Sequence, residues 1–216
     1  TSASNRTVAV VNANPAAPVV ASNSPVCEGA IIQLSTTTNA ATYQWTGPNG
    51  YTSNAPNPAA IAPATASNAG VYRLAITDAN GCSAPASTTN VVVNPAPARP
   101  AITSNAPICA GEVLTLSTSS TAANYRWIAP NGADTTTTSS PVNIAPSSTL
   151  YQDGDWTLSI TDANGCSSTA SALSSVVINT APTAVSATNK GPVCTGDAVQ
   201  LSASTINGAT YAWYAD

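Results

Sequence analysis

The sequence predicts an all-β chain made of tandem antiparallel sandwiches arranged end to end. Ser and Thr make up about a quarter of the 216 residues and 17 residues are Pro, a composition that favours short β-branched strands over helices. A set of motifs recurs along the chain, and each copy holds about seven short apolar stretches separated by turn residues. The chain is therefore long enough for two complete sandwiches and parts of two more.

The recurring block begins with Pro-x-Cys-x-Gly, continues through Tyr-x-Trp and Pro-Asn-Gly, and ends with Asp-Ala-Asn-Gly-Cys. The first copy runs from Pro25 to Cys82 and the second from Pro107 to Cys166. A third copy starts at Pro192 and stops shortly after its Tyr-x-Trp motif. The spacing is regular, since 82 residues separate Cys27 from Cys109 and Trp45 from Trp127, and 84 separate Cys82 from Cys166.

These copies divide the chain into four parts. We assign residues 1–14 to the last strand of a preceding repeat, 15–97 to the first repeat, 98–181 to the second, and 182–216 to the first half of a truncated third repeat. The first assignment rests on Thr7-Val-Ala-Val-Val-Asn12, which matches the last strand of each complete repeat. Pro-rich joints of polyproline II character separate the repeats. We therefore expect a window from a longer array.

Each repeat is predicted to contain about seven strands. In the first repeat, Ile32 and Leu34 point to one face of their strand and Ile31 and Gln33 to the other. Tyr43 and Trp45 share a face in the same way. The recurring Asp-Ala-Asn-Gly segments predict hairpin turns with positive φ at Asn-Gly. The expected strands of the first repeat lie at 18–22, 30–36, 41–46, 59–62, 70–77 and 87–94, with a weak strand within 52–58.

An aromatic residue near the start of the sixth strand resembles the tyrosine corner of immunoglobulin-like domains. Tyr72 follows Gly70 and precedes Leu74 by two residues, whereas the second repeat has Trp156 at this position and lacks the hydroxyl. We therefore predict immunoglobulin-like sandwiches, with the hydroxyl bond of the corner missing in the second repeat. The expected core residues are Trp45, Trp127, Trp213, Leu34, Leu74, Leu116, Leu158 and Tyr72.

The full motif set resembles the Ig-like and PKD-like repeats of large surface proteins from Bacteroidota, including gliding-type adhesins and type IX secreted proteins. The resemblance covers nearly the whole chain. It implies an extracellular location, at the bacterial cell surface or secreted, and a role as stalk or spacer, because such repeats serve mainly to separate other domains.

Composition argues against several classes of function. Nine acidic residues against five basic ones give a net charge of -4, which makes nucleic acid a poor partner. No apolar run approaches the roughly 18 residues that cross a bilayer. His is absent, so the chain has neither a triad base nor an imidazole ligand. We expect no enzyme, no catalytic residue, no cofactor and no membrane insertion.

The carboxylates also fit a structural role. Glu28, Glu112 and Asp197 lie beside the first Cys of a repeat, and Asp78 and Asp162 occupy turns, where such residues usually cap their own loop. A glycosidase would need two carboxylates across one cleft. Asp153-Gly-Asp155 has the residues of a calcium ligand pair, but the other copy reads Ala69-Gly-Val71, so we expect no metal site.

We expect a structural, non-enzymatic segment of an extracellular filament or giant adhesin stalk. Its partners would be neighbouring Ig-like repeats of the same or an identical chain, with a surface glycan or protein at a distal tip. The alternative is a glycan- or protein-binding accessory module of a secreted multidomain enzyme, with Trp45, Trp127 and Trp213 as a stacking platform. Recurrence of Tyr-x-Trp on the third strand favours the core over that platform.

The five cysteines leave two disulfide patterns open. Pairing within repeats would join Cys27 to Cys82 and Cys109 to Cys166. Cys27 precedes the second strand and Cys82 follows the sixth, so these residues should lie at opposite ends of one sandwich, far beyond the limit of about 7 Å between bonded Cα atoms. We therefore prefer a bond between repeats, from Cys27 to Cys166, and expect Cys194 to find its partner outside the chain.

Overall fold

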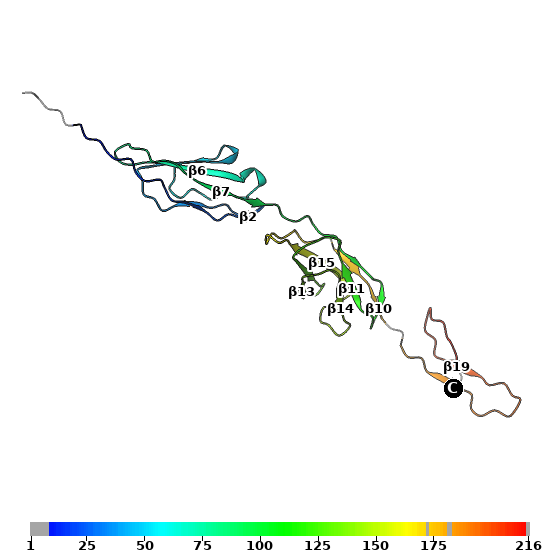
Figure 1. The fold of residues 1–216 in the computed structure, drawn as a ribbon. Helices are drawn as coiled ribbons and strands as arrows, with labels where there is room; N and C mark the ends of the chain where they lie inside the picture. Colours follow the sequence, from blue (N-terminus) through cyan, green and yellow to red (C-terminus); the bar gives the residue numbers. More distant parts are fainter. Residues whose placement is uncertain (1–8, 172, 181–182, 215–216) are drawn as a thin grey trace, which may run out of the picture.

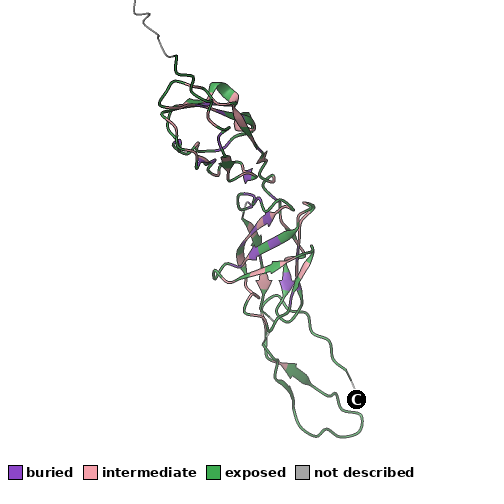
Figure 2. Cartoon of the chain, turned by 60° about the vertical axis from the view of Figure 1, so that its left-hand side comes forward, coloured by how far each residue is buried: buried purple, intermediate pink, exposed green. Residues whose placement is uncertain are grey.

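The protein is an elongated chain of β-sandwiches (Figure 1). The computed structural model describes residues 9–171, 173–180 and 183–214. Two sandwiches follow one another along one axis, and a sparsely ordered third segment follows the second (Figures 1 and 2). Residues 1–14 were expected to be the last strand of a preceding repeat. Residues 1–8 lie outside the described part of the chain, and residues 9–14 form no strand.

The first repeat has the sheet arrangement of an immunoglobulin-like domain. One sheet has the order β5-β4-β6-β7, and β8 continues β7 and pairs in parallel with β2. In the other sheet β1 pairs with β3, and Ile32 forms a bridge to Ile61. The strands are β1 (Val20–Ser22), β2 (Val26–Cys27), β3 (Leu34–Thr36), β4 (Thr42–Thr46), β5 (Thr52–Ser53), β6 (Gly70–Thr77), β7 (Ser87–Val91) and β8 (Val93–Asn94), with 3₁₀ turns at Pro48–Gly50 and Ala66–Asn68.

The second repeat has the same plan, and its sheet equivalent to β1-β3 has three strands instead of two. The order β14-β11-β9 faces β13-β12-β15-β16, and β10 pairs in parallel with β17. Its strands are β9 (Thr103–Ser104), β10 (Ile108–Cys109), β11 (Leu114–Ser117), β12 (Asn124–Ile128), β13 (Asp134–Thr137), β14 (Val142–Ile144), β15 (Gly154–Thr161), β16 (Ser174–Val176) and β17 (Ile178–Asn179).

The structure adds one element that the sequence pattern does not predict. The short strands β2 and β10 precede the expected second strand and run parallel to the last strand of their repeat, with Cys27 opposite Asn94 and Cys109 opposite Asn179. A strand of two residues is too short to show a period-two pattern. In contrast, the expected strand at 59–62 is reduced to the single bridge at Ile61.

Each complete repeat has its own hydrophobic core. Trp45 and Trp127 are fully buried at the centre of these cores, and the described structure gives their indole N–H groups no acceptor, so they stabilise the fold through apolar contact alone. Ile32 is buried and the adjacent Ile31 is exposed, as the alternation predicts. The other expected core residues that are buried in these repeats are Leu34, Leu74, Leu116, Leu158 and Tyr72.

The expectation that Trp213 is a core residue is wrong for this structure. The third segment forms only β18 (Ala187–Asn189) and β19 (Leu201–Ala203), which pair with each other. Trp213 stays 49% exposed because no facing sheet covers it among the described residues. Tyr211 nevertheless donates its hydroxyl to Ser204 O, as Tyr125 does to Ser120 O, so the third segment begins like a repeat.

The aromatic corner is present in both repeats. The Tyr72 hydroxyl donates to Asn68 O over 3.0 Å, and Trp156 Nε1 donates to Gln152 O over 3.2 Å, in each case four residues back. Burial raises the pKa of the Tyr72 hydroxyl, and the nearby Tyr51 raises it further. In the second repeat, an indole N–H thus replaces the phenolic hydroxyl as donor.

The glycine two residues before each corner has a steric reason to recur. Gly70 has φ +135° and Gly154 has φ +113°, conformations that other residues rarely adopt. A Cβ on Gly70 would also lie 2.9 Å from the Pro48 ring, and one on Gly154 would lie 3.1 Å from the Pro130 ring. This contact links the recurring Pro-Asn-Gly and Gly-x-aromatic motifs.

We predict that Trp127→Ala destabilises the second repeat by about 3–5 kcal/mol, because it leaves a cavity at the centre of the core. Trp213→Ala is the matched control, since this ring is half exposed and its loss should change stability little. Urea denaturation followed by circular dichroism measures both. Equal midpoints for the two variants would contradict the core assignment of Trp127.

Candidate functional site

Side chains with catalytic or ligating chemistry do not converge in the described residues. Across residues 9–171, 173–180 and 183–214, no three Cys, Asp or Glu side chains gather closely enough to hold a metal ion. Trp45 and Trp127 are fully buried, so neither offers a ring face for stacking on a sugar. The distinctive chemistry of the molecule lies at its cysteines.

Cys27 begins a tight turn at the end of the first sandwich that faces the second repeat. Ala30 N donates to Cys27 O over 3.1 Å, and Gly29 adopts φ +82°, as the third residue of a type II turn must. The turn leaves β2, where the adjacent Glu28 N donates to Asn94 O over 2.8 Å. The Cys-x-Gly motif was the sequence signal for this turn, and the parallel strand pair fixes its place at the domain end.

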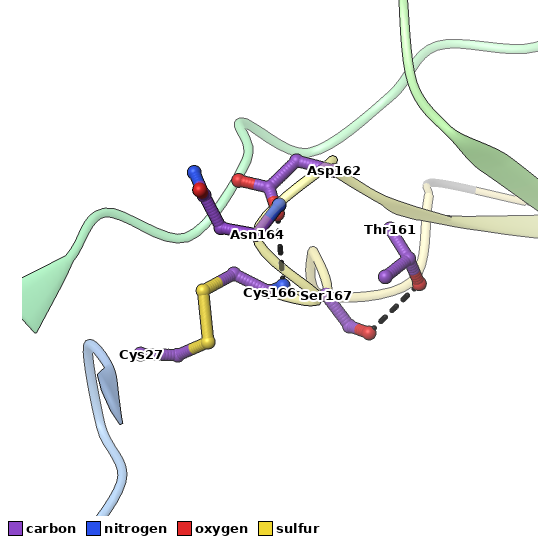
Figure 3. Close-up of a disulfide and its surroundings, with 6 residues drawn as sticks. All are labelled: Cys27, Thr161, Asp162, Asn164, Cys166 and Ser167. Atoms are coloured by element: carbon purple, nitrogen blue, oxygen red, sulfur yellow. Dashed lines mark hydrogen bonds between the residues drawn. A yellow bond between two sulfur atoms is a disulfide. The ribbon is translucent and has the colours of Figure 1, made fainter. Parts of the chain in front are cut away.

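Cys166 closes a hairpin loop that one carboxylate organises. Asp162 Oδ1 accepts hydrogen bonds from the backbone N–H groups of Asn164 and Cys166, each over 2.9 Å (Figure 3). Asp162 N in turn donates to Cys166 O over 2.9 Å, and Gly165 has φ +80°. Within the Asn164-Gly165 pair, only the glycine has a positive φ. Asp162 therefore caps its own loop and holds the cysteine at the end of the second repeat.

A disulfide joins these two loops and so connects the two repeats (Figure 3). Cys27 and Cys166 have Cα atoms 5.5 Å apart and are separated by 139 residues in sequence. Cys166 has no exposed surface. Cys82 and Cys109 are free thiols, so the alternative pairing within repeats is not the one in this structure.

The bond both stabilises the folded chain and restricts the joint between the repeats. In the chain-entropy account, a disulfide between residues 139 positions apart stabilises the folded state by roughly 4–5 kcal/mol relative to the chain without the bond. The second connection is the Pro-rich segment that follows Asn94, which by itself is only semi-rigid. Two covalent connections between the same pair of domains limit bending far more than one.

The free cysteines occupy the same two kinds of loop. Cys82 N donates to Asp78 Oδ1 over 2.8 Å, as Cys166 does to Asp162. Cys109 N donates to Glu112 Oε2 over 2.7 Å, and Cys194 N donates to Asp197 Oδ2 over 3.3 Å. The carboxylates beside these cysteines thus hold their turns, whereas Glu28 has no side-chain hydrogen bond among those described.

Comparison with known proteins agrees with this architecture. Residues 95–177 match the family model of a PKD-like domain, which corresponds to the second repeat. No curated protein matches the sequence significantly.

Several solved structures are similar to this chain at low sequence identity. Murine CEACAM1b is 15% identical, with 74% of this chain and 99% of that chain covered and a TM-score of 0.42. The fibronectin(III)-like modules of Clostridium thermocellum CbhA are 16% identical, with 75% and 95% covered and a TM-score of 0.40. Three N-terminal domains of the bacteriophage RB49 Hoc protein are also 16% identical, with 88% and 70% covered and a TM-score of 0.40. The fold assignment rests on the sheet topology described above.

The fold and the disulfide together indicate a structural or binding module of the kind found in extracellular proteins. Disulfides persist in oxidising environments and are rare in the cytosol. The short 3₁₀ turns in the described residues lack the length and hydrophobicity needed to cross a membrane.

We predict that Asp162→Ala weakens the loop that presents Cys166, because two backbone N–H groups lose their charged acceptor. The cost should be about 1–3 kcal/mol, and the Cys27–Cys166 bond should re-form more slowly after reduction. Thiol labelling during reoxidation measures this rate. Asp78→Ala removes the equivalent carboxylate beside Cys82 and should leave the rate unchanged, so equal slowing by both variants would contradict a local role of Asp162.

Proposed function

We propose that this chain is a structural, non-enzymatic segment of an extracellular filament or adhesin stalk that transmits mechanical load. The observation that supports it most is the disulfide between Cys27 and Cys166, because this bond connects consecutive domains rather than the two sheets of one domain. A bond at this place does little for the core of either sandwich. It acts on the joint.

The position of the bond determines how force passes through the chain. Tension applied at the two ends reaches Cys27, crosses the disulfide, and continues from Cys166. The segment between them, which includes Trp45, Trp127 and most residues of both cores, is thereby outside the force path. Most of each sandwich is thus protected from extension while the bond is oxidised, whereas β1, β16 and β17 lie outside the bonded segment. This suits a fibre that must resist lengthening.

The setting of this role is also part of the proposal. The motif resemblance to repeats of Bacteroidota surface proteins supports a cell-surface or secreted location, and the PKD-like match of the second repeat is compatible with it. The partners of each repeat are then its neighbours of the same type. The alternative, a glycan- or protein-binding accessory module, loses its expected platform because Trp45 and Trp127 are buried.

Single-molecule pulling from the two ends of the chain tests this function. The oxidised chain should show no extension from the segment between Cys27 and Cys166. The double variant Cys27→Ser with Cys166→Ser should release about 480 Å of additional contour length, since a stretched chain spans up to about 3.5 Å per residue over 139 residues.

The matched control is Cys109→Ser, which changes an exposed thiol and should leave the oxidised behaviour intact. If the oxidised chain and the double variant release the same contour length, the disulfide does not carry the load and the proposed role is wrong.

A further inference from the structure

The outer edge of the four-stranded sheet is paired over a shorter length in the first repeat than in the second. In the second repeat, β13 pairs with β12 over four residues and ends with Thr137 opposite Tyr125. In the first repeat, β5 pairs with β4 over two residues and ends with Ser53 opposite Trp45. Tyr43, which is equivalent to Tyr125, therefore lies beyond the end of β5.

The backbone groups of Tyr43 point toward this uncovered edge. In an antiparallel pair, alternate residues direct both their N–H and their C=O to the same neighbouring strand. Gly47 N donates to Tyr51 O over 3.0 Å on the β5 side, and Trp45 and Tyr43 follow at intervals of two residues. In the described part of the chain, Tyr43 has no backbone partner on this side. One donor and one acceptor are thus available at the edge.

The chain leaves this edge at a defined point. Continued register would place Ala55 opposite Tyr43, but Ala55 N donates to Ser53 Oγ over 3.3 Å instead. Thr36 N, which belongs to the other sheet, then donates to Asn57 Oδ1 over 3.2 Å. Hydrogen bonds therefore fix the departure of the chain, and the edge stays open in the folded state.

A polar hollow lies beside the open edge. Its volume is about 430 Å³, and its lining residues are Ala41, Thr42, Tyr43, Gln44 and Asn54. None of these five is charged, whereas the residue equivalent to Gln44 in the second repeat, Arg126, forms an ion pair with Asp134. Hydroxyl and amide groups can each donate and accept hydrogen bonds. The hollow therefore matches uncharged polar side chains better than charged ones.

We infer that this edge binds an extended, uncharged and hydroxyl-rich peptide segment of a partner protein, which adds a strand beside Tyr43. The second repeat shows what occupies the equivalent place, since β13 ends with three threonines and pairs Thr137 with Tyr125. The bound segment donates one N–H to Tyr43 O and accepts one hydrogen bond from Tyr43 N. Main-chain bonds of this kind supply affinity, and the hollow selects the alternate side chains.

This inference goes beyond the proposed load-bearing role and does not depend on it. The open edge lies along one sheet of the first sandwich, whereas the disulfide joins loops at the ends of two sandwiches. The double variant Cys27→Ser with Cys166→Ser should therefore still bind the peptide. Either proposal can fail while the other holds.

The test is an NMR titration of the isotopically labelled full chain with a capped peptide of residues 135–139, Thr-Thr-Thr-Thr-Ser. The peptide should shift the Tyr43 amide signal and slow its hydrogen exchange. The Tyr125 amide serves as the internal control, because β13 already pairs with it, and should not change.

A matched peptide isolates the main-chain bonds. N-methylation of its third residue, which takes the place of Thr137, removes the donor to Tyr43 O and should weaken binding about fivefold or more. A protein variant tests the edge itself. Replacing Asn54, Ala55 and Pro56 together by Thr gives the first repeat the threonine run of residues 136–138, so β5 should extend over Tyr43 and the peptide should no longer bind.

Three results would overturn the inference: no change at the Tyr43 amide, equal changes at Tyr43 and Tyr125, or equal binding of the plain and N-methylated peptides. A neutral oligosaccharide, maltotriose, is titrated in parallel. If it shifts the Tyr43 and Gln44 signals while the peptide does not, the hollow is a sugar site and the inference is wrong. The N-methylated peptide needs no protein variant, so the test holds even if the triple variant fails to fold.

Discussion

The covalent contact between two end loops is the constraint on which the arrangement of this molecule depends. Each loop is built by local rules: a type II turn that needs a glycine, and a hairpin loop organised by one carboxylate. Their sandwiches place them at facing ends, and the bond then fixes the distance between Cys27 and Cys166 Cα atoms at 5.5 Å. A Pro-rich joint that would only be semi-rigid becomes a doubly connected one.

The composition explains why such a bond is useful. Only 6% of the residues are charged, and Phe, Met and His are absent. Each core therefore depends on a few large side chains, around Trp45 in the first repeat and around Trp127 and Trp156 in the second. The ion pair of Arg126 with Asp134 is half exposed, and surface pairs of this kind contribute little stability. Burial in small cores and cross-linking between them are therefore the main sources of stability.

Much of this architecture could be predicted from the sequence, because comparison of the two complete repeats shows which residues recur and which residues vary. Alternation identified Ile32 and Leu34 as buried, and the distance between the ends of a sandwich argued against a bond from Cys27 to Cys82. Strands β2 and β10 could not be predicted, because two residues carry no period and their pairing with the last strand is non-local. The donor role of Trp156 was also missed, since the sequence pattern pointed only to a hydroxyl. Trp213 shows that a core position is buried only where the facing sheet is present.

The most direct test of the account is the cysteine connectivity of the oxidised chain, determined by mass spectrometry of a non-reduced tryptic digest. Trypsin cleaves after Arg and Lys but not at Arg99, which precedes Pro100, so Cys27, Cys166 and Cys194 fall in separate peptides and Cys82 shares one with Cys109. The account predicts that peptide 7–73 is joined to peptide 127–190. A join of peptide 7–73 to peptide 74–126 would pair Cys27 with Cys82 or Cys109 and contradict it.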